Sequence, residues 1–135
     1  MKVFEGTPKN DWGEKVNFID ENNVFVGYDM GQSCCEHAEW FVADEIKRKM
    51  PCEKDRSNSE GLESYRFDPE FFEQPTYLEY EDMDGNALDS GEMAVFRMTD
   101  GENEKFLHLF NCHNGYYDHG FTMKIGDEMK REGYL

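Results

Sequence analysis

Basic residues are few in this chain of 135 residues. Lys and Arg number 14 against 30 Asp and Glu, so the formal net charge at pH 7 is -16. A chain with this charge repels nucleic acid and anionic membrane surfaces, and it attracts basic proteins and cations. We therefore expect a basic protein as the partner, and we expect no direct binding to nucleic acid or to membranes.

Long apolar runs are also missing. The opening residues, MKVFEGTPKNDWGEK, lack the apolar segment of a signal peptide, and no stretch approaches the roughly 18 apolar residues of a membrane span. We therefore expect a cytoplasmic protein, and the sequence leaves its oligomeric state open. Cys34, Cys35, Cys52 and Cys112 should then be thiols, because the cytosol keeps cysteines reduced and adjacent cysteines bridge each other only with strain.

Leucine and isoleucine are scarce, whereas Phe, Trp and Tyr make up 15% of the chain. Aromatic and methionine side chains must therefore supply much of the core. The length suits one domain with one core, and no internal repeat divides the chain. We expect a single domain over residues 1–135, with a polar loop at about 48–75 that holds at most one short helical turn near 69–73.

Short β-prone runs separated by turn signals predict most of the secondary structure. The runs at 15–20 and 24–29 are separated by Glu-Asn-Asn, which predicts an early hairpin. Turns at DGNALDSG, TDGENE and HNGY separate four further predicted strands, at 77–83, 93–98, 105–112 and 116–125. These strands favour an antiparallel sheet of about five or six strands.

The turn at Asn114-Gly115 gives the sharpest local prediction, because Asn-Gly between β-rich runs is typical of a two-residue hairpin. Such a hairpin, with the structural turn Asn114, Gly115, Tyr116 and Tyr117, would place Phe110 opposite His119. One face of it then carries mainly apolar side chains with two histidines and a cysteine: Phe106, His108, Phe110, Cys112, Tyr117, His119, Phe121, Met123 and Ile125. We expect this face to form core.

A helix is predicted just before the polar loop. Ser33 and Glu36 fit a capping box, in which each side chain binds the backbone N–H of the other residue. Downstream, apolar residues recur with a helical period on one side of the segment, at Ala38, Phe41, Val42 and Ile46. The expected fold class is therefore α+β, a single domain in which one main helix at 34–49 packs on one face of the antiparallel sheet.

Three interpretations of the cysteine pair stay open. The plainest is that Cys34 and Cys35 are small buried helix residues, because free cysteine is among the most buried residue types. The second is a zinc site, in which the helix packs on the last hairpin and the ligands come from a pool of thiolates and imidazoles: Cys34, Cys35, Cys112, His108 and His119. The third is a cysteine nucleophile with His37 or His113 as base, although no oxyanion hole or orienting acid accompanies it.

Two other groups of residues stand out. The acidic run around DMDGN resembles a calcium loop, but its glycine is misplaced and a hairpin turn explains it better. Its carboxylates form a candidate anionic interaction surface: Glu79, Glu81, Asp82 and Asp84. An aromatic group could instead line a ligand pocket or belong to the core: Trp40, Tyr116, Tyr117 and Phe121. No known catalytic motif is present, so no catalytic residue is predicted.

The hairpin leading into Cys34-Cys35-Glu36 and the strand pair turning at Asn114-Gly115-Tyr116-Tyr117 together resemble a family of small, uncharacterised proteins of bacteria and phages. The family is marked by a Cys-Cys-Glu helix start and an Asn-Gly-Tyr-Tyr turn, and the resemblance covers about 16–40 and 95–121. The positions of His113 and His119 are not always histidine in it, which favours a structural role for the cysteines and the turn. The resemblance implies a phage-type accessory protein and brings no activity with it.

Charge and resemblance together predict an acidic, non-catalytic interaction protein, a phage-encoded modulator or inhibitor of a host protein. The alternative is a zinc-binding protein, either stapled by a structural zinc or acting as a small metal-dependent hydrolase. The first function needs no cofactor, and the second needs zinc.

Overall fold

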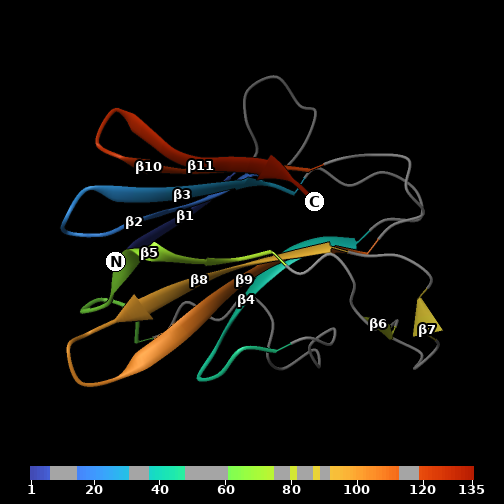
Figure 1. Ribbon diagram of the computed structural model, residues 1–135, viewed down its shortest axis with the longest axis horizontal. Helices are drawn as coiled ribbons and strands as arrows, with labels where there is room; N and C mark the ends of the chain where they lie inside the picture. Colours follow the sequence, from blue (N-terminus) through green and yellow to red (C-terminus); the bar gives the residue numbers. More distant parts are fainter. Residues whose placement is uncertain are drawn as a thin grey trace.

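The computed structural model describes residues 1–6, 15–30, 37–47, 61–74, 80–81, 87–88, 92–112 and 119–135. In this part of the chain two antiparallel sheets lie face to face (Figure 1). The five-stranded sheet has the order β1 (Lys2–Gly6), β2 (Lys15–Ile19), β3 (Val24–Asp29), β10 (Gly120–Ile125) and β11 (Glu128–Tyr134). The four-stranded sheet has the order β4 (His37–Ala43), β9 (Glu104–Cys112), β8 (Glu92–Thr99) and β5 (Arg66–Glu73).

The described residues contain no helix, so the predicted α+β class is wrong and this part of the fold is all-β. A third, two-stranded sheet joins β6 (Tyr80–Glu81) to β7 (Ala87–Leu88). None of the described segments forms a helix with the length and apolar character that crossing a bilayer requires.

The hairpins with turn signals at their tips are confirmed. Strands β2 and β3 pair around Glu-Asn-Asn, where Asn23 takes the left-handed conformation at φ 61°. Strands β8 and β9 pair from Glu92↔Asn111 to Thr99↔Glu104, and the turn between them contains Gly101 at φ 101°. Both tips need a positive φ, which asparagine and glycine adopt most readily, so local chemistry fixes these turns.

The predicted hairpin between 105–112 and 116–125 is wrong. Strand β9 pairs with β4 and β8 in one sheet, whereas β10 pairs with β3 and β11 in the other. The chain therefore crosses between the sheets after Cys112, and the predicted turn residues 114–117 lie outside the described residues. Phe110 lies opposite Glu39 on β4 and Met93 on β8, so it is not a cross-strand partner of His119.

The predicted helix at 34–49 is also wrong where the structure describes it. Residues 37–43 form β4, which pairs with β9 along its whole length, and 44–47 are not helical. Ala38 and Trp40 face the space between the sheets, whereas Phe41 packs on the opposite face. Trp40, Phe41 and Val42 are consecutive apolar residues that lie on both faces of β4, so the segment lacks the alternation that identifies a half-buried strand.

The polar loop predicted at 48–75 is wrong in its last third. Strand β5 occupies Arg66–Glu73 where a loop with a helical turn was expected. Its pairing with β8 is interrupted between Phe67 and Phe72, the stretch that contains Pro69. Proline removes a ladder donor and is tolerated at an edge strand or an irregularity, and β5 is an edge strand with both properties.

The main core fills the space between the two sheets. It is rich in aromatic and methionine side chains, as the composition predicts, and includes Phe18, Tyr28, Trp40, Phe96, Met98, Phe121 and Met123. A second, smaller core lies on the outer face of the four-stranded sheet: Phe41, Met93, Val95, Phe106 and Phe110. Strand β9 contributes side chains to both cores. Leu107 and Leu109, which face the main core, and Phe106 and Phe110, which face the second core, are all buried.

A buried carboxylate joins the two sheets. Asp20 is 7% exposed, and its Oδ1 accepts hydrogen bonds from the backbone N–H groups of Asn22 and Val24, both at 2.9 Å. Its Oδ2 accepts the N–H of Phe67 on β5 at 2.7 Å. The carboxylate thus shapes the β2–β3 turn and holds it against β5, so three donors compensate its burial.

Candidate functional site

His108, one member of the predicted zinc ligand pool, is a core residue. Its ring is fully buried on β9 and stacks on Phe41 with 4.2 Å between centroids and 8° between planes. The backbone N–H of Lys47 donates to Nε2 at 2.9 Å, which leaves Nδ1 to donate to the carbonyl of Phe106 at 3.1 Å. Burial lowers the pKa of His108 to about 4, so the ring is neutral and has no lone pair available for a metal.

His119 lies elsewhere, beside the five-stranded sheet. It is 3% exposed, its Nδ1 donates to the backbone carbonyl of Asp29 at 2.9 Å, and its ring lies 6.4 Å from that of Tyr28. The structure therefore does not bring His108 and His119 together, since the first belongs to the outer face of the other sheet. Cys34, Cys35 and the side chain of Cys112 lie outside the described residues, and the described side chains contain no group of three His, Cys, Asp or Glu able to hold a metal.

The predicted anionic surface is described only in part. Glu81 lies in β6, whereas Glu79, Asp82 and Asp84 are outside the described residues. Tyr80 pairs with Leu88 and Glu81 with Ala87, which agrees with a hairpin at DMDGN rather than a calcium loop.

The predicted aromatic pocket is not formed by its described members. Trp40 is 1% exposed and its ring meets that of Phe18 edge to face at 5.0 Å. Phe121 is 2% exposed and packs against Phe72 and Phe96. Both residues belong to the core between the sheets, and Tyr116 and Tyr117 are outside the described residues.

Negative charge gathers at one end of the sandwich. The turns β2–β3, β8–β9 and β10–β11 lie at the same end in Figure 1, and the end of β4 and the start of β5 join them there. We call this region the acidic end. It carries carboxylates from five separate segments: Glu21, Asp44, Glu45, Glu63, Asp100, Glu102, Glu104, Asp127 and Glu128.

Basic residues neutralise only part of this charge. Four carboxylates have ion pairs, namely Glu21 with Arg66, Asp44 with Lys105, Glu45 with Lys47 and Glu104 with Arg97. The other five have no ion pair within the described part of the chain: Glu63, Asp100, Glu102, Asp127 and Glu128. The acidic end therefore has a surplus of negative charge.

Two carboxylates of the acidic end ionise more readily than usual. Hydrogen bonds from the backbone N–H groups of Asn103 and Glu102 lower the pKa of Asp100. A hydrogen bond with Lys105 lowers the pKa of Asp44. Both groups are thus fully charged at neutral pH.

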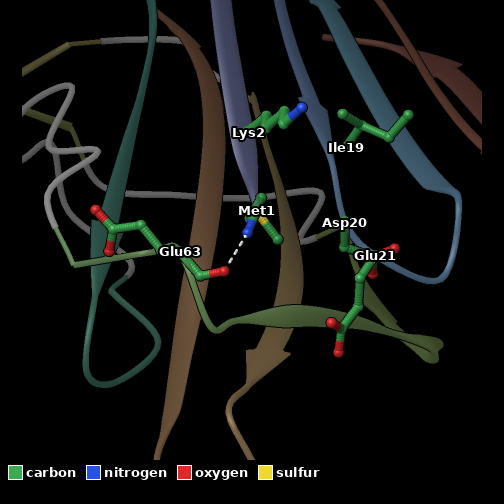
Figure 2. Close-up of a pocket in the computed structure, with 6 residues that line it drawn as sticks. All are labelled: Met1, Lys2, Ile19, Asp20, Glu21 and Glu63. Carbon is green, nitrogen blue, oxygen red and sulfur yellow. Dashed lines mark hydrogen bonds between the residues drawn. The ribbon is translucent and has the colours of Figure 1, made fainter.

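A recess of about 480 Å³ opens at this end (Figure 2). It is lined by Met1, Lys2, Ile19, Asp20, Glu21 and Glu63. Figure 2 shows the side chains of Glu21 and Glu63 on opposite sides of Met1, whose amino group donates to the backbone carbonyl of Glu63 at 2.8 Å. The carboxylates beside the recess suit a guanidinium or an ammonium group.

Sequence reasoning missed the acidic end because its members are spread over the chain. Each turn shows the signal separately, as ENN, DGENE and GDE, but only the strand order shows that these turns meet. No family model, curated protein or solved structure matches the chain.

Proposed function

We propose that this chain is an acidic, non-catalytic interaction protein that binds a basic partner through its acidic end. The observation that carries the proposal is the surplus of carboxylates there, supplied by five separate segments, two of which line the recess with Glu21 and Glu63. His108 and His119 are each bonded to a backbone carbonyl, which suits core roles better than acid–base catalysis. The resemblance to bacterial and phage proteins would make the partner a host protein that this chain modulates or inhibits.

Electrostatic steering gives the mechanism. Exposed carboxylates that share one end of a small domain add their potentials, which raises the rate of encounter with a basic surface. A long basic side chain of the partner would then enter the recess beside Glu21 and Glu63. Arg66 already forms an ion pair with Glu21 at 3.4 Å. An arginine of the partner would form the same kind of ion pair with Glu21, either beside Arg66 or in its place.

The test compares two doubly neutralised variants with the same change in charge. Glu102→Gln with Glu128→Gln removes two charges from the acidic end, and Glu92→Gln with Glu132→Gln removes two from elsewhere. A partner retained from a bacterial host lysate is identified, and its association rate is measured at about 50 and about 500 mM salt. We expect the first variant to associate about tenfold more slowly at low salt and the second to change less than about twofold.

High salt should remove most of the difference, because the Debye length falls from roughly 14 Å to roughly 4 Å over this range. Equal effects of the two variants, or association that does not respond to salt, would contradict the proposal.

A further inference from the structure

The five-stranded sheet has an exposed apolar face, which is turned away from the four-stranded sheet (Figure 1). Successive residues of a strand point to opposite faces, so the residues that alternate with the core residues Val16, Val26 and Phe121 point outward. We call this surface the five-strand face. The strand register lines up its apolar members across the sheet: Phe4, Ile19, Phe25, Met129 and Tyr134. Phe4, Met129 and Tyr134 are 53%, 46% and 68% exposed.

Two glycines make the five-strand face flat. A Cβ added at Gly27 would lie 2.9 Å from the ring of Phe25, and one added at Gly120 would lie 3.7 Å from the ring of Tyr134. Both rings therefore lie along the sheet, over glycine backbone, instead of standing away from it. The face thus offers a low apolar surface on which a second sheet can pack.

Positive charge on the five-strand face is not neutralised by the chain itself. The other basic side chains that the structure describes have a carboxylate or an aromatic ring as partner: Lys47, Arg66, Arg97, Lys105, Lys130 and Arg131. Lys2, Lys15 and Lys124 form no ion pair within the described part of the chain, and all three belong to this face. The face also carries Asp29 and Glu132, so lysines outnumber carboxylates there in a chain of charge -16.

We propose that two copies of this chain form a weak dimer by packing their five-strand faces together. Two chains that each carry a charge of -16 repel each other, and the repulsion is smallest where lysines outnumber carboxylates. Two flat apolar faces that meet there remove their exposed aromatic and methionine side chains from water, which favours association.

The charges of the face are self-complementary. Lys2 and Lys15 lie in β1 and β2 at one side of the sheet, and Glu132 lies in β11 at the other side. A two-fold axis along the middle strand, β3, would place each side over the opposite side of the second copy. Lysines of one copy then meet a carboxylate of the other, and Phe25 on β3 meets its own counterpart.

The size of the face sets the expected strength. Five strands about 4.8 Å apart, with about five residues of about 3.3 Å each, cover roughly 24 Å by 17 Å, or about 400 Å² on each copy. This area is about half of what a standard interface buries on each partner. We therefore expect a dissociation constant of about 10–100 μM at moderate salt.

Sedimentation equilibrium of the full chain tests the proposal. Over about 5–500 μM protein in reducing buffer we expect an equilibrium between monomer and dimer, with no larger species. The dimer should tighten about tenfold between about 50 and about 500 mM NaCl, because salt screens the repulsion between the two chains. Docking of a basic partner at the acidic end should weaken over the same range, so either proposal can fail without the other.

Phe4→Ser and Tyr134→Ser should each raise the dissociation constant at least about fivefold. These residues lie on the two opposite edge strands of the sheet, so an interface formed by pairing two edges would depend on one of them only. The matched control is Ile125→Ser, which removes an exposed apolar side chain beside the β10–β11 turn. It should change the dissociation constant by less than about twofold.

A second pair of variants tests the lysines. Lys15→Glu adds negative charge to the face and should weaken the dimer at least about tenfold, whereas Lys47→Glu makes the same change in net charge elsewhere and should have less than about a twofold effect. Lys15 is exposed, so this pair decides the matter even if a serine variant fails to fold. The proposal is overturned by protein that stays monomeric at about 500 μM, by equal effects of the two lysine variants, or by association that is lost in Glu102→Gln with Glu128→Gln.

Discussion

At the scale of single residues, His108 shows how a titratable group becomes part of a core. Its ring fills the outer core of the four-stranded sheet against Phe41, and both ring nitrogens have backbone partners. The sequence shows a histidine among alternating apolar residues, which suits a metal ligand as well as a core residue. The structure separates the two, because a metal ligand needs a free lone pair and the N–H of Lys47 occupies the one on Nε2.

The buried neutral ring makes stability depend on pH. Burial holds the pKa of His108 at about 4 in the folded chain, against about 6.5 when unfolded. Between these values the unfolded chain binds a proton that the folded chain does not, so stability is full above about pH 6.5 and falls until about pH 4. We expect His108 to contribute a loss of about 2 kcal/mol between pH 7 and pH 4.5.

The measurement is urea unfolding of wild type and His108→Gln at both pH values. The variant will be less stable at pH 7, because it loses the stacking on Phe41, but it should lose less stability on acidification than wild type. The carboxylates titrate in both proteins, so the difference between the two pH responses isolates the histidine. Parallel responses would show that the ring is not neutral and buried as described.

At the scale of strands, close packing between β10 and β11 depends on a missing side chain. Phe121 is the cross-strand partner of Gly133, and a Cβ added at Gly133 would lie 2.8 Å from the ring of Phe121. That ring is packed against Phe72 and Phe96, so it cannot move aside without disturbing the core. Gly133→Ala should therefore destabilise the protein by about 1–3 kcal/mol, the usual effect of overpacking.

Gly120→Ala on the neighbouring strand is the matched control. A Cβ at Gly120 meets only the ring of Tyr134, at 3.7 Å, which is ordinary contact distance. We expect its free energy of unfolding to stay within about 0.5 kcal/mol of wild type. If thermal or urea unfolding showed equal effects of the two substitutions, the described packing of Phe121 over Gly133 would be wrong.

The strands also show which parts of the fold local sequence determines. The β2–β3 and β8–β9 hairpins could be predicted, because Asn23 and Gly101 supply the backbone conformation that each tip requires. Strand β4 is buried on both faces, and there the apolar pattern does not separate helix from strand. The pattern of β9 predicts a strand correctly but does not identify its partners. Strand β10 pairs with β3 instead of with β9. This pairing depends on burial across the whole sandwich, which no short motif indicates.

The same limit applies to the candidate sites. The acidic turns are visible one by one in the sequence, but their meeting at one end follows from the strand order. The predicted zinc site depends on a helix packed against the last hairpin, and the crossing between the sheets after β9 removes that hairpin and separates His108 from His119.

At the scale of the whole molecule, the charge of -16 acts against the fold as well as for binding. Carboxylates that share one end repel one another, and a folded chain holds them closer than an unfolded chain does. Salt screens this repulsion, so we expect the Tm of wild type to rise by a few degrees between about 20 and about 300 mM NaCl. The variant with Glu102→Gln and Glu128→Gln should start with a higher Tm at low salt and gain less from added NaCl.

The control with Glu92→Gln and Glu132→Gln distinguishes clustered charge from total charge, because it reaches the same net charge by changes outside the acidic end. If repulsion depended only on net charge, both variants would lose the salt response equally. If the acidic end concentrates the repulsion, the control should keep a response close to that of wild type. Repulsion within the cluster lowers the stability of the free protein, and a basic partner relieves this repulsion when it binds. The residues with the largest effect on the salt dependence of Tm should therefore also have the largest effect on the association rate.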